Sequence, residues 1–213
     1  MYELIIFDLD GTLLDTSQGI FKSVRYAEEY LSLAAIPDQM LKKFVGPPPQ
    51  KVYKELYHLN EEESAKAVAY HREYGRNKGI YESEVYPGII KLLSKLKEKN
   101  YKVAVATLKA QDIAEQALEY HFIRNYFDII VGMDKKESLT KCQTIQQVLK
   151  NTDINKDNVV MIGDSVYDME GAKEASVDFI GVTYGFGFDF NDKDKYSDMM
   201  ATSVDELEKM LRL

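Results

Sequence analysis

Short runs of apolar residues alternate along most of the chain with longer segments of helical periodicity. The runs are continuous, which is typical of strands covered on both faces of a parallel sheet. Five of them predict strands, at residues 4–7, 103–106, 129–131, 159–162 and 179–182.

Between these runs, apolar residues recur every three or four positions, which places them on one face of a helix. Such stripes predict helices at residues 89–96, 113–118 and 142–149. Near the end of the chain, Ser203 and Glu206 have the spacing of an N-terminal capping box, which predicts a last helix. The alternation of strands and helices predicts an α/β fold with a doubly wound parallel sheet and a Rossmann-like core.

Residues 15–84 interrupt this alternation, because they contain helical patterns and no convincing strand. One of these patterns, at residues 61–74, is rich in Glu and Ala, which favour helices. We therefore expect a helical cap domain at residues 15–84, inserted after the first strand. The α/β core would then comprise residues 1–14 and 85–213.

The composition restricts the partners and the compartment. The chain has 213 residues and a net charge of -8, and this acidity argues against nucleic acid and anionic membranes as partners. The one cysteine, Cys142, cannot form an intrachain disulfide, which suits a reducing compartment. The N-terminus lacks the basic start and long apolar stretch of a signal peptide, so we expect a cytoplasmic protein. The oligomeric state stays open.

The strongest chemical signal is Asp8-Leu9-Asp10-Gly11-Thr12, directly after the first predicted strand. Ligands of open parallel sheets bind beyond the carboxyl ends of the strands, where both carboxylates lie. Two crowded carboxylates are costly unless a cation or a proton sits between them. The alternative is a structural turn at Asp10-Gly11, since Asp-Gly favours tight bends.

A second acidic motif, Gly163-Asp164-Ser165-Val166-Tyr167-Asp168, follows the fourth predicted strand. Carboxylates that converge from two strand ends form an oxygen-rich site suited to Mg²⁺. Helix capping by Asp164 or Asp168 is the alternative, and it is the better explanation of this motif taken alone. The presence of Asp8 and Asp10 favours metal binding.

Two further segments carry candidate phosphate ligands. Thr107 ends the second predicted strand, and its hydroxyl and the N–H groups next to it, near Leu108, suit a phosphoryl oxygen. Lys141 lies near the start of a predicted helix, where its charge would neutralise a phosphate and the Asp8 carboxylate. Without the acidic motifs, a solvated loop and a solvated lysine would be the simpler interpretations.

These motifs, in this order, resemble the haloacid dehalogenase superfamily over the whole chain, and the insertion resembles its cap of the first type. Within it, Tyr86-Pro87-Gly88-Ile89 and Gly181-Val182-Thr183-Tyr184-Gly185 are similar to stretches of phosphoglycolate phosphatase-like and 5'-nucleotidase-like members. Two positions depart from the pattern: Leu108 replaces a residue that is often small or polar, and Cys142 stands where a proline often follows the lysine.

The resemblance implies a Mg²⁺-dependent phosphatase that acts on a small phosphorylated molecule through an aspartyl-phosphate. It implies that Asp8 is the nucleophile and Asp10 the general acid and base. Mg²⁺ would be bound by Asp8, Asp164 and the backbone carbonyl of Asp10. The remaining roles are substrate binding by Thr107, Leu108 and Lys141, and support by Asp168 and Thr12.

Two other functions stay open at this stage. A β-phosphoglucomutase-like phosphomutase would share Asp8 and Asp10, and a sugar-1,6-bisphosphate requirement would reveal it. A phospho-accepting regulatory protein of the receiver type would also have an acidic Mg²⁺ site on a parallel sheet. Such receivers have no large insertion after the first strand and need no acid at Asp10, which argues against them.

Overall fold

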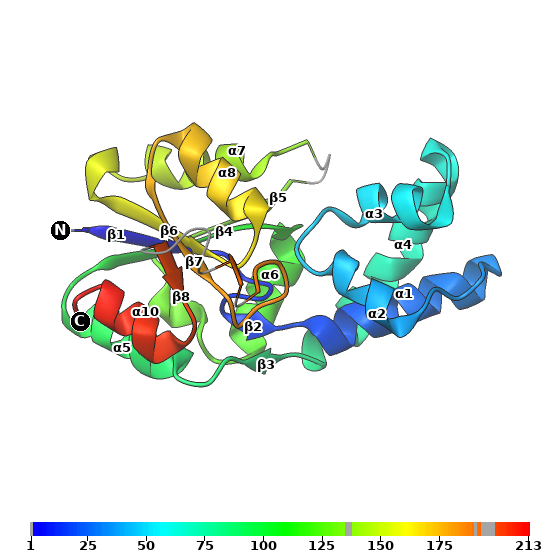
Figure 1. The fold of residues 1–213 in the computed structure, drawn as a ribbon, viewed down its shortest axis with the longest axis horizontal. Coiled ribbons are helices and arrows are strands. Elements are labelled where there is room, and N and C mark those ends of the chain that lie inside the picture. Colours follow the sequence, from blue (N-terminus) through cyan, green and yellow to red (C-terminus); the bar gives the residue numbers. More distant parts are fainter. Residues whose placement is uncertain (1, 135–137, 190, 193–198) are drawn as a thin grey trace.

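A parallel sheet forms the centre of the computed structural model, which describes residues 2–134, 138–189, 191–192 and 199–213 (Figure 1). The strands lie in the order β5-β4-β1-β6-β7-β8, and every neighbouring pair is parallel. They are β1 (Leu4–Phe7), β4 (Lys102–Ala110), β5 (Ile129–Met133), β6 (Val159–Gly163), β7 (Asp178–Val182) and β8 (Met200–Ala201). The predicted parallel α/β fold is confirmed.

Helices cover both faces of this sheet, because successive side chains of a strand point to opposite sides. Ile5 and Phe7 of β1 join one buried apolar cluster, and Leu4 and Ile6 join another. The first cluster includes side chains from α5 (Ile89–Glu98), α6 (Gln111–Tyr120) and α10 (Val204–Met210). The second includes side chains from α7 (Lys141–Lys150) and α8 (Val166–Ala175).

The observed strands differ from the prediction in length and number. The strand β4 runs to Ala110 although its apolar run ends at Ala106, and its pairing with β5 shifts register between these two residues. The strands β8, β2 (Leu14–Asp15) and β3 (Glu84–Val85) were not predicted, since each has two residues and is too short for a periodic pattern. The short helices η3 (Arg124–Tyr126) and η4 (Lys156–Asn158) precede β5 and β6.

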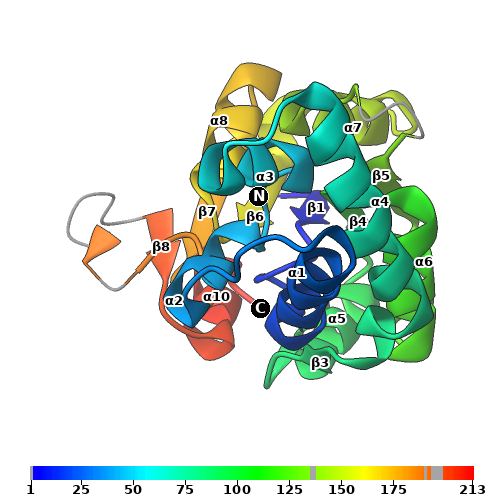
Figure 2. The same ribbon diagram turned by 90° about the vertical axis from the view of Figure 1, so that its right-hand side faces the viewer.

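The insertion leaves the core and returns to it through one pair of strands. The strand β2 pairs antiparallel with β3, so the chain enters and leaves the insertion side by side. Between them lie α1 (Ser17–Leu31), α2 (Asp38–Leu41), η1 (Lys42–Phe44), α3 (Pro49–Tyr57), α4 (Glu61–Asn77) and η2 (Gly79–Tyr81). Figure 1 shows these helices at the end of the molecule opposite the N-terminus, and Figure 2 shows them in front of the sheet.

The helical insertion has a small apolar core of its own. Its buried members come from several of its helices and from the residue after η1: Ile20, Val24, Ala27, Leu41, Phe44, Val45, Val52, Tyr53, Ala67 and Val68. We call this set the insert cluster. Because the insertion buries its own apolar side chains, we propose that residues 15–84 form a separate cap domain. Within the described part of the chain, no helix has the length and apolar character needed to cross a membrane.

The carboxyl ends of the central strands point toward this insertion (Figure 1). The strands β1 and β6 are neighbours, with Phe7 in register with Ile162. The backbone N–H of Asp8 continues the ladder by donating to the Ile162 carbonyl at 2.8 Å. The two acidic motifs therefore begin next to each other, although they are far apart in sequence.

Candidate active site

Three buried carboxylates meet where β1 and β6 end. Asp8, Asp164 and Asp168 each present one oxygen, and these oxygens all lie within 4.8 Å of one another. Asp8 follows β1, Asp164 follows β6, and Asp168 lies in the first turn of α8. The structure therefore brings together acidic side chains from the two motifs.

Lys141 joins this cluster from the first position of α7. Its Nζ lies 2.6 Å from Oδ1 of Asp8 and 2.7 Å from Oδ1 of Asp168, and it donates to the Ala106 carbonyl at 2.9 Å. The side chain is buried, with hydrogen bonds to Asp8 and Ala106 and an ion pair to Asp168. Burial alone would lower the pKa of Lys141, but Asp168 and Asp8 raise it overall, so the ammonium stays charged.

The carboxylate of Asp164 is held by backbone N–H groups of the loop after β7. Its Oδ2 accepts hydrogen bonds from Phe186 at 2.8 Å and from Gly187 at 3.2 Å. The Thr12 hydroxyl approaches Oδ1 at 3.5 Å, which is a weak contact. Gly11 has a φ of +80°, and a Cβ at this position would overlap the Asp164 carboxylate. The glycine of the first motif thus permits the close approach of the two acidic loops.

Asp168 is fixed by the residue that begins its own helix. Ser165 caps α8 and donates its hydroxyl to Oδ2 of Asp168 at 2.6 Å, and the Ser165 N–H reaches the same oxygen at 3.0 Å. The capping that the sequence offered as an alternative to metal binding is therefore present, with Ser165 as the N-cap and Asp168 completing the capping box. It coexists with the carboxylate cluster.

The charges of this cluster fit a divalent cation. Three carboxylates and the Lys141 ammonium leave two negative charges uncompensated among buried groups. Burial, opposed in part by Lys141, raises the pKa of Asp8 to about 7. Burial together with Asp168 and Asp8 raises the pKa of Asp164 to about 8. A hard cation with oxygen ligands would relieve this crowding, so the residues present suit Mg²⁺.

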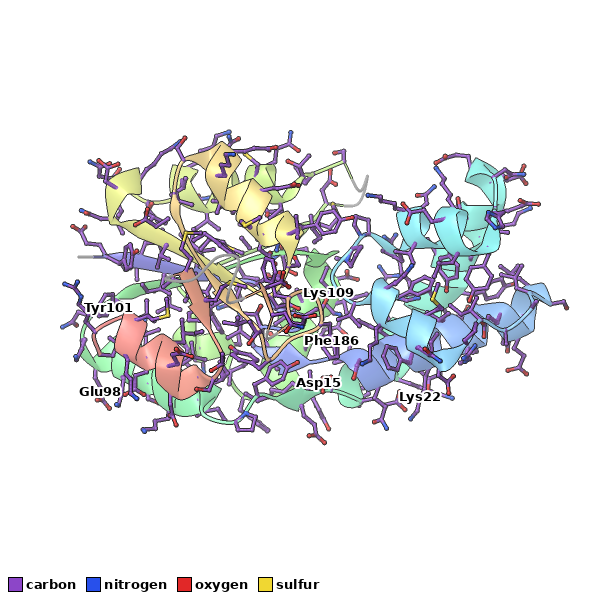
Figure 3. The ribbon with its side chains drawn as sticks, viewed as in Figure 1. Asp15, Lys22, Glu98, Tyr101, Lys109 and Phe186 are labelled. Atoms are coloured by element: carbon purple, nitrogen blue, oxygen red, sulfur yellow. The ribbon has the colours of Figure 1, made fainter. Side chains whose placement is uncertain are left out.

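Asp10 lies outside the carboxylate cluster and pairs with Lys109. The Nζ of Lys109 is 2.9 Å from Oδ1 and 3.2 Å from Oδ2 of Asp10. Figure 3 labels Lys109 where the core meets the helical insertion. No role was predicted for the Lys109 side chain from the sequence. The extension of β4 beyond Ala106 has no apolar run, so the sequence held no signal for this residue.

The predicted phosphate ligand Thr107 lies in the register shift of β4. Its hydroxyl oxygen accepts a hydrogen bond from the Lys109 N–H at 3.2 Å, which leaves the hydroxyl proton for another acceptor. The side chain is buried. The next residue, Leu108, lines the cleft between the core and the insertion.

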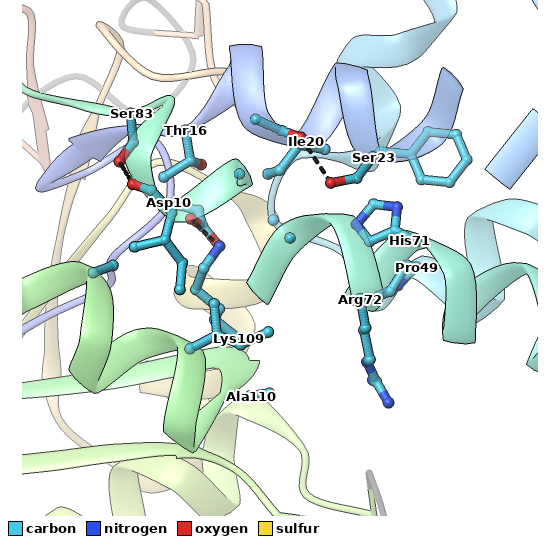
Figure 4. Close-up of a pocket in the computed structure, with 18 of the residues that line it drawn as sticks. Asp10, Thr16, Ile20, Ser23, Pro49, His71, Arg72, Ser83, Lys109 and Ala110 are labelled. Carbon is cyan, nitrogen blue, oxygen red and sulfur yellow. Dashed lines mark hydrogen bonds and ion pairs between the residues drawn. The ribbon is translucent and has the colours of Figure 1, made fainter. Parts of the chain in front are cut away.

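This cleft connects Asp10 with the helical insertion (Figure 4). Lys109 and Leu108 line it from the core, and His71 and Arg72 line it from α4. Burial lowers the pKa of His71 to about 3, with a further contribution from Lys109, so the imidazole is neutral. The lining is thus a mixture of cationic, neutral polar and apolar side chains.

Of five cationic residues of the insertion, namely Lys22, Arg25, Arg72, Arg76 and Lys78, one lines the cleft. Lys22 pairs with Glu82, Arg25 with Glu28 and Asp38, and Arg76 with Asp112, whereas Lys78 lies over the Tyr74 ring. Arg72 is the one of the five that lines the cleft. Its pKa is lowered, mainly by burial and also by Arg76.

Comparison with known proteins identifies the family. Residues 5–182 match the family described as haloacid dehalogenase-like hydrolase. The chain belongs to this family. This match confirms the resemblance that the sequence motifs predicted, and phosphatases are among the similar proteins.

Three relatives illustrate the likeness. A predicted phosphatase from Clostridium acetobutylicum has 39% sequence identity and a TM-score of 0.92, with 100% of both chains covered. A 5'-nucleotidase from Pseudomonas aeruginosa is 34% identical over 187 residues, which cover 87% of this chain and 85% of the relative. The tyrosine-protein kinase PtkA of Mycobacterium tuberculosis is 31% identical over 212 residues, which cover 98% of this chain and 72% of the relative.

Proposed function

We propose that this dehalogenase-like hydrolase is a Mg²⁺-dependent phosphatase of small phosphate monoesters, with Asp8 as the nucleophile. One observation carries the proposal: the Asp8 carboxylate is buried beside two further carboxylates and an ammonium group, two residues before Asp10, which lines the cleft. A buried nucleophile with these neighbours suits the attack on a phosphate, whose charge the same neighbours must balance.

In the first step, a carboxylate oxygen of Asp8 attacks the phosphorus, and the bond from phosphorus to the leaving oxygen breaks. Asp10 donates its proton to the departing alkoxide. The products are an aspartyl-phosphate on Asp8, the free alcohol and the Asp10 carboxylate. Lys109 lies beside Asp10 and balances its charge in this state.

In the second step, water attacks the phosphorus of the aspartyl-phosphate and gives a proton to the Asp10 carboxylate. The bond between the phosphorus and the Asp8 oxygen breaks, which releases inorganic phosphate and restores both side chains. Asp10 thus acts as an acid and then as a base, and Lys109 holds it within reach of both reacting oxygens.

We propose that Asp8, Asp164 and the Asp10 backbone carbonyl hold Mg²⁺. When bound, the ion neutralises charge on the phosphoryl oxygens and on the attacking carboxylate. Asp168 is suited to a supporting role, because one of its oxygens contacts Lys141 and the other accepts from Ser165. The Thr12 hydroxyl makes a weak contact, at 3.5 Å, with the Oδ1 atom of Asp164, which gives Thr12 a minor supporting role.

Thr107 and Lys141 are proposed to bind the nonbridging phosphoryl oxygens. The Thr107 hydroxyl has a proton to donate. Lys141 would exchange one of its present acceptors for a phosphoryl oxygen while its charge stays next to Asp8. Leu108 would contact the leaving group, since it lines the cleft on the Asp10 side.

The substrate class is small phosphorylated metabolites, of the phosphoglycolate or nucleoside monophosphate type. The 5'-nucleotidase from Pseudomonas aeruginosa supports the second type. A cationic side chain in the cleft, Arg72, supports a leaving group that carries a negative charge, as phosphoglycolate does. Comparing kcat/KM for phosphoglycolate, nucleoside monophosphates and sugar phosphates separates these possibilities, and faster turnover with added sugar-1,6-bisphosphate would reveal a phosphomutase.

Turnover of p-nitrophenyl phosphate tests the proposed chemistry. We expect steady hydrolysis with Mg²⁺, none with excess EDTA, and none with Asp8→Asn, which keeps the size of the side chain but removes the nucleophile. Rapid acid quenching with labelled substrate should trap phosphate on the wild-type protein and none on this variant. Turnover by Asp8→Asn at the wild-type rate would exclude the mechanism.

Phosphoryl transfer to tyrosine is a second candidate, because PtkA is similar over 98% of this chain. Such a reaction would need ATP as donor and a phenol as acceptor in place of water. Incubation with γ-labelled ATP and a tyrosine-containing polymer distinguishes the two: a kinase labels the polymer, and a phosphatase of monoesters leaves it unlabelled.

A further inference from the structure

Two segments next to Asp164 also contact the helical insertion, each through an aromatic side chain. One is the second acidic motif itself, and the other is the loop after β7 that donates hydrogen bonds to Asp164. The Phe186 side chain, in the loop after β7, packs against the insert cluster. Tyr167, between Asp164 and Asp168, accepts a hydrogen bond from Lys51 of α3 at 3.0 Å, and the ammonium lies 5.4 Å from the centre of its ring. Figure 3 shows Phe186 at the junction between the core and the insertion.

The backbone around Phe186 is bonded to Asp164 at several points. The Phe186 and Gly187 N–H groups donate to its carboxylate at 2.8 and 3.2 Å. The Phe188 N–H donates to its carbonyl oxygen at 2.7 Å. One short segment therefore holds both the side chain and the backbone of Asp164 while its aromatic ring contacts the insertion.

The packing of this segment leaves it little room to move independently of Asp164. A Cβ on Gly185 would overlap the Gly11 carbonyl oxygen and the Asp164 side chain. A Cβ on Gly187 would meet the Asp164 carbonyl oxygen. Close-packed groups transmit displacements to their neighbours. A shift of the Phe186 ring therefore also shifts the N–H groups that orient the Asp164 carboxylate.

From this arrangement we infer that Phe186 is a positioning residue that couples closure of the helical insertion to the orientation of the Asp164 carboxylate. With the insertion closed, the ring is held by the insert cluster and the two N–H donors are fixed on Oδ2. With the insertion open, the ring loses this contact and Asp164 is held less firmly. The inference rests on the proposed function, in which Asp164 binds Mg²⁺.

Coupling of this kind acts in both directions. If closure improves the metal site, Mg²⁺ must favour the closed arrangement by the same factor. Phe186 should therefore affect metal affinity without touching the metal, and it should affect the shape of the protein in the presence of the metal. A residue that merely fills space beside the insertion would change neither property.

The first measurement is Mg²⁺ binding without substrate, by isothermal titration calorimetry. We expect Phe186→Ala to weaken Mg²⁺ binding about tenfold, the lower end of the effect of removing a group that orients a metal ligand. Phe186→Leu keeps an apolar side chain against the insert cluster and should retain most of the affinity. Phe122→Ala is the matched control, because this phenylalanine is 90% exposed and belongs to neither the site nor the insertion.

The second measurement is the radius of gyration by small-angle X-ray scattering, with and without Mg²⁺. The wild-type protein and Phe122→Ala should become more compact with Mg²⁺, and Phe186→Ala should not. Wild-type Mg²⁺ affinity in Phe186→Ala, or the same compaction in that variant, would overturn the inference. If Phe186→Ala does not fold, Phe186→Val supplies the same comparison with a smaller truncation.

These measurements separate the inference from the proposed function. If the wild-type protein fails to hydrolyse p-nitrophenyl phosphate but Phe186→Ala still weakens Mg²⁺ binding, the coupling stands and the phosphatase proposal falls. If hydrolysis is Mg²⁺-dependent and Phe186→Ala binds Mg²⁺ normally, the phosphatase proposal stands and the coupling is refuted.

Discussion

The ammonium nitrogen of Lys109 lies 2.9 Å from one carboxylate oxygen of Asp10 and 3.2 Å from the other. This pair stands at the border of the core and the insertion, next to the space where a leaving group would bind (Figure 4). It connects the bulged end of β4 with the first acidic motif. Its position suggests that Asp10 depends on Lys109 for its orientation.

Replacing Lys109 should therefore impair catalysis while leaving the metal site intact. We expect Lys109→Met to lower kcat/KM by about ten- to a hundredfold. Without Lys109 the Asp10 carboxyl is less well oriented, so part of the rate enhancement from general acid catalysis is lost. Lys109→Arg keeps the charge and should lose less. Steady-state kinetics measure the effect, and Mg²⁺ titration provides the control. Wild-type kcat/KM in Lys109→Met would show that Asp10 needs no such partner.

The role of Asp10 as general acid predicts a dependence on the leaving group. Asp10→Asn should slow hydrolysis of an alkyl phosphate by about 10²- to 10⁴-fold, because an alkoxide needs a proton as it departs. Formation of the aspartyl-phosphate from p-nitrophenyl phosphate should be affected much less, since p-nitrophenolate is a stable anion. Rapid-quench kinetics compare the two substrates. An equal loss for both would remove Asp10 from the first proton transfer.

The raised pKa values of Asp8 and Asp164 predict how pH affects the metal-free fold. Their pKa values, about 7 and about 8, exceed those of aspartates in an unfolded chain, so the folded state binds more protons. The stability that this contributes is fully present at pH 4 and below. It is lost as the pH rises through 7 to 8.

Mg²⁺ should counteract that loss, because it replaces the protons on the carboxylates. The rise in melting temperature on adding Mg²⁺ should therefore be larger at pH 8.5 than at pH 6. Below pH 7, Mg²⁺ affinity should increase by about tenfold per pH unit for each proton released. Thermal unfolding with Mg²⁺ and with EDTA checks this. A metal-induced shift that is independent of pH would contradict the assignment of Asp8 and Asp164 as ligands.

Gly11 and Gly46 form a matched pair for testing the close contact between the acidic loops. Both have positive φ, at +80° and +96°, so an alanine at either position is strained by about 1 kcal/mol. A Cβ at Gly11 would overlap the Asp164 carboxylate, whereas a Cβ at Gly46 has no atom within 4 Å. We expect both variants to lose stability in urea unfolding, and only Gly11→Ala to lose Mg²⁺ binding. Normal Mg²⁺ binding by Gly11→Ala would mean that Asp164 can shift freely.

The meeting of the two acidic motifs could be predicted from the sequence, because parallel strands end at the same edge of a sheet. Asp8 and Asp164 each follow a continuous apolar run, and β1 and β6 prove to be neighbours. Lys141 could be placed at the start of a helix. The contact of Lys141 with Asp8 depends on how α7 packs on the sheet, and hydrophobic periodicity does not reveal that packing.

Other parts of the site could not be predicted, for identifiable reasons. The donors to Asp164 are backbone N–H groups of Phe186 and Gly187, and residue type carries no information about them. Lys109 looked like an ordinary charged residue after a strand, because the extension of β4 beyond Ala106 has no apolar run to indicate it. The strands β2 and β3 are too short to leave a pattern.

That short strand pair has a consequence for the evolution of the molecule. Since the chain leaves through β2 and returns through the adjacent β3, everything between Asp15 and Glu84 can change in length or sequence without altering the register of the central sheet. Substrate preference can thus diversify in one portion of the protein while the phosphoryl-transfer machinery is inherited unchanged in the other.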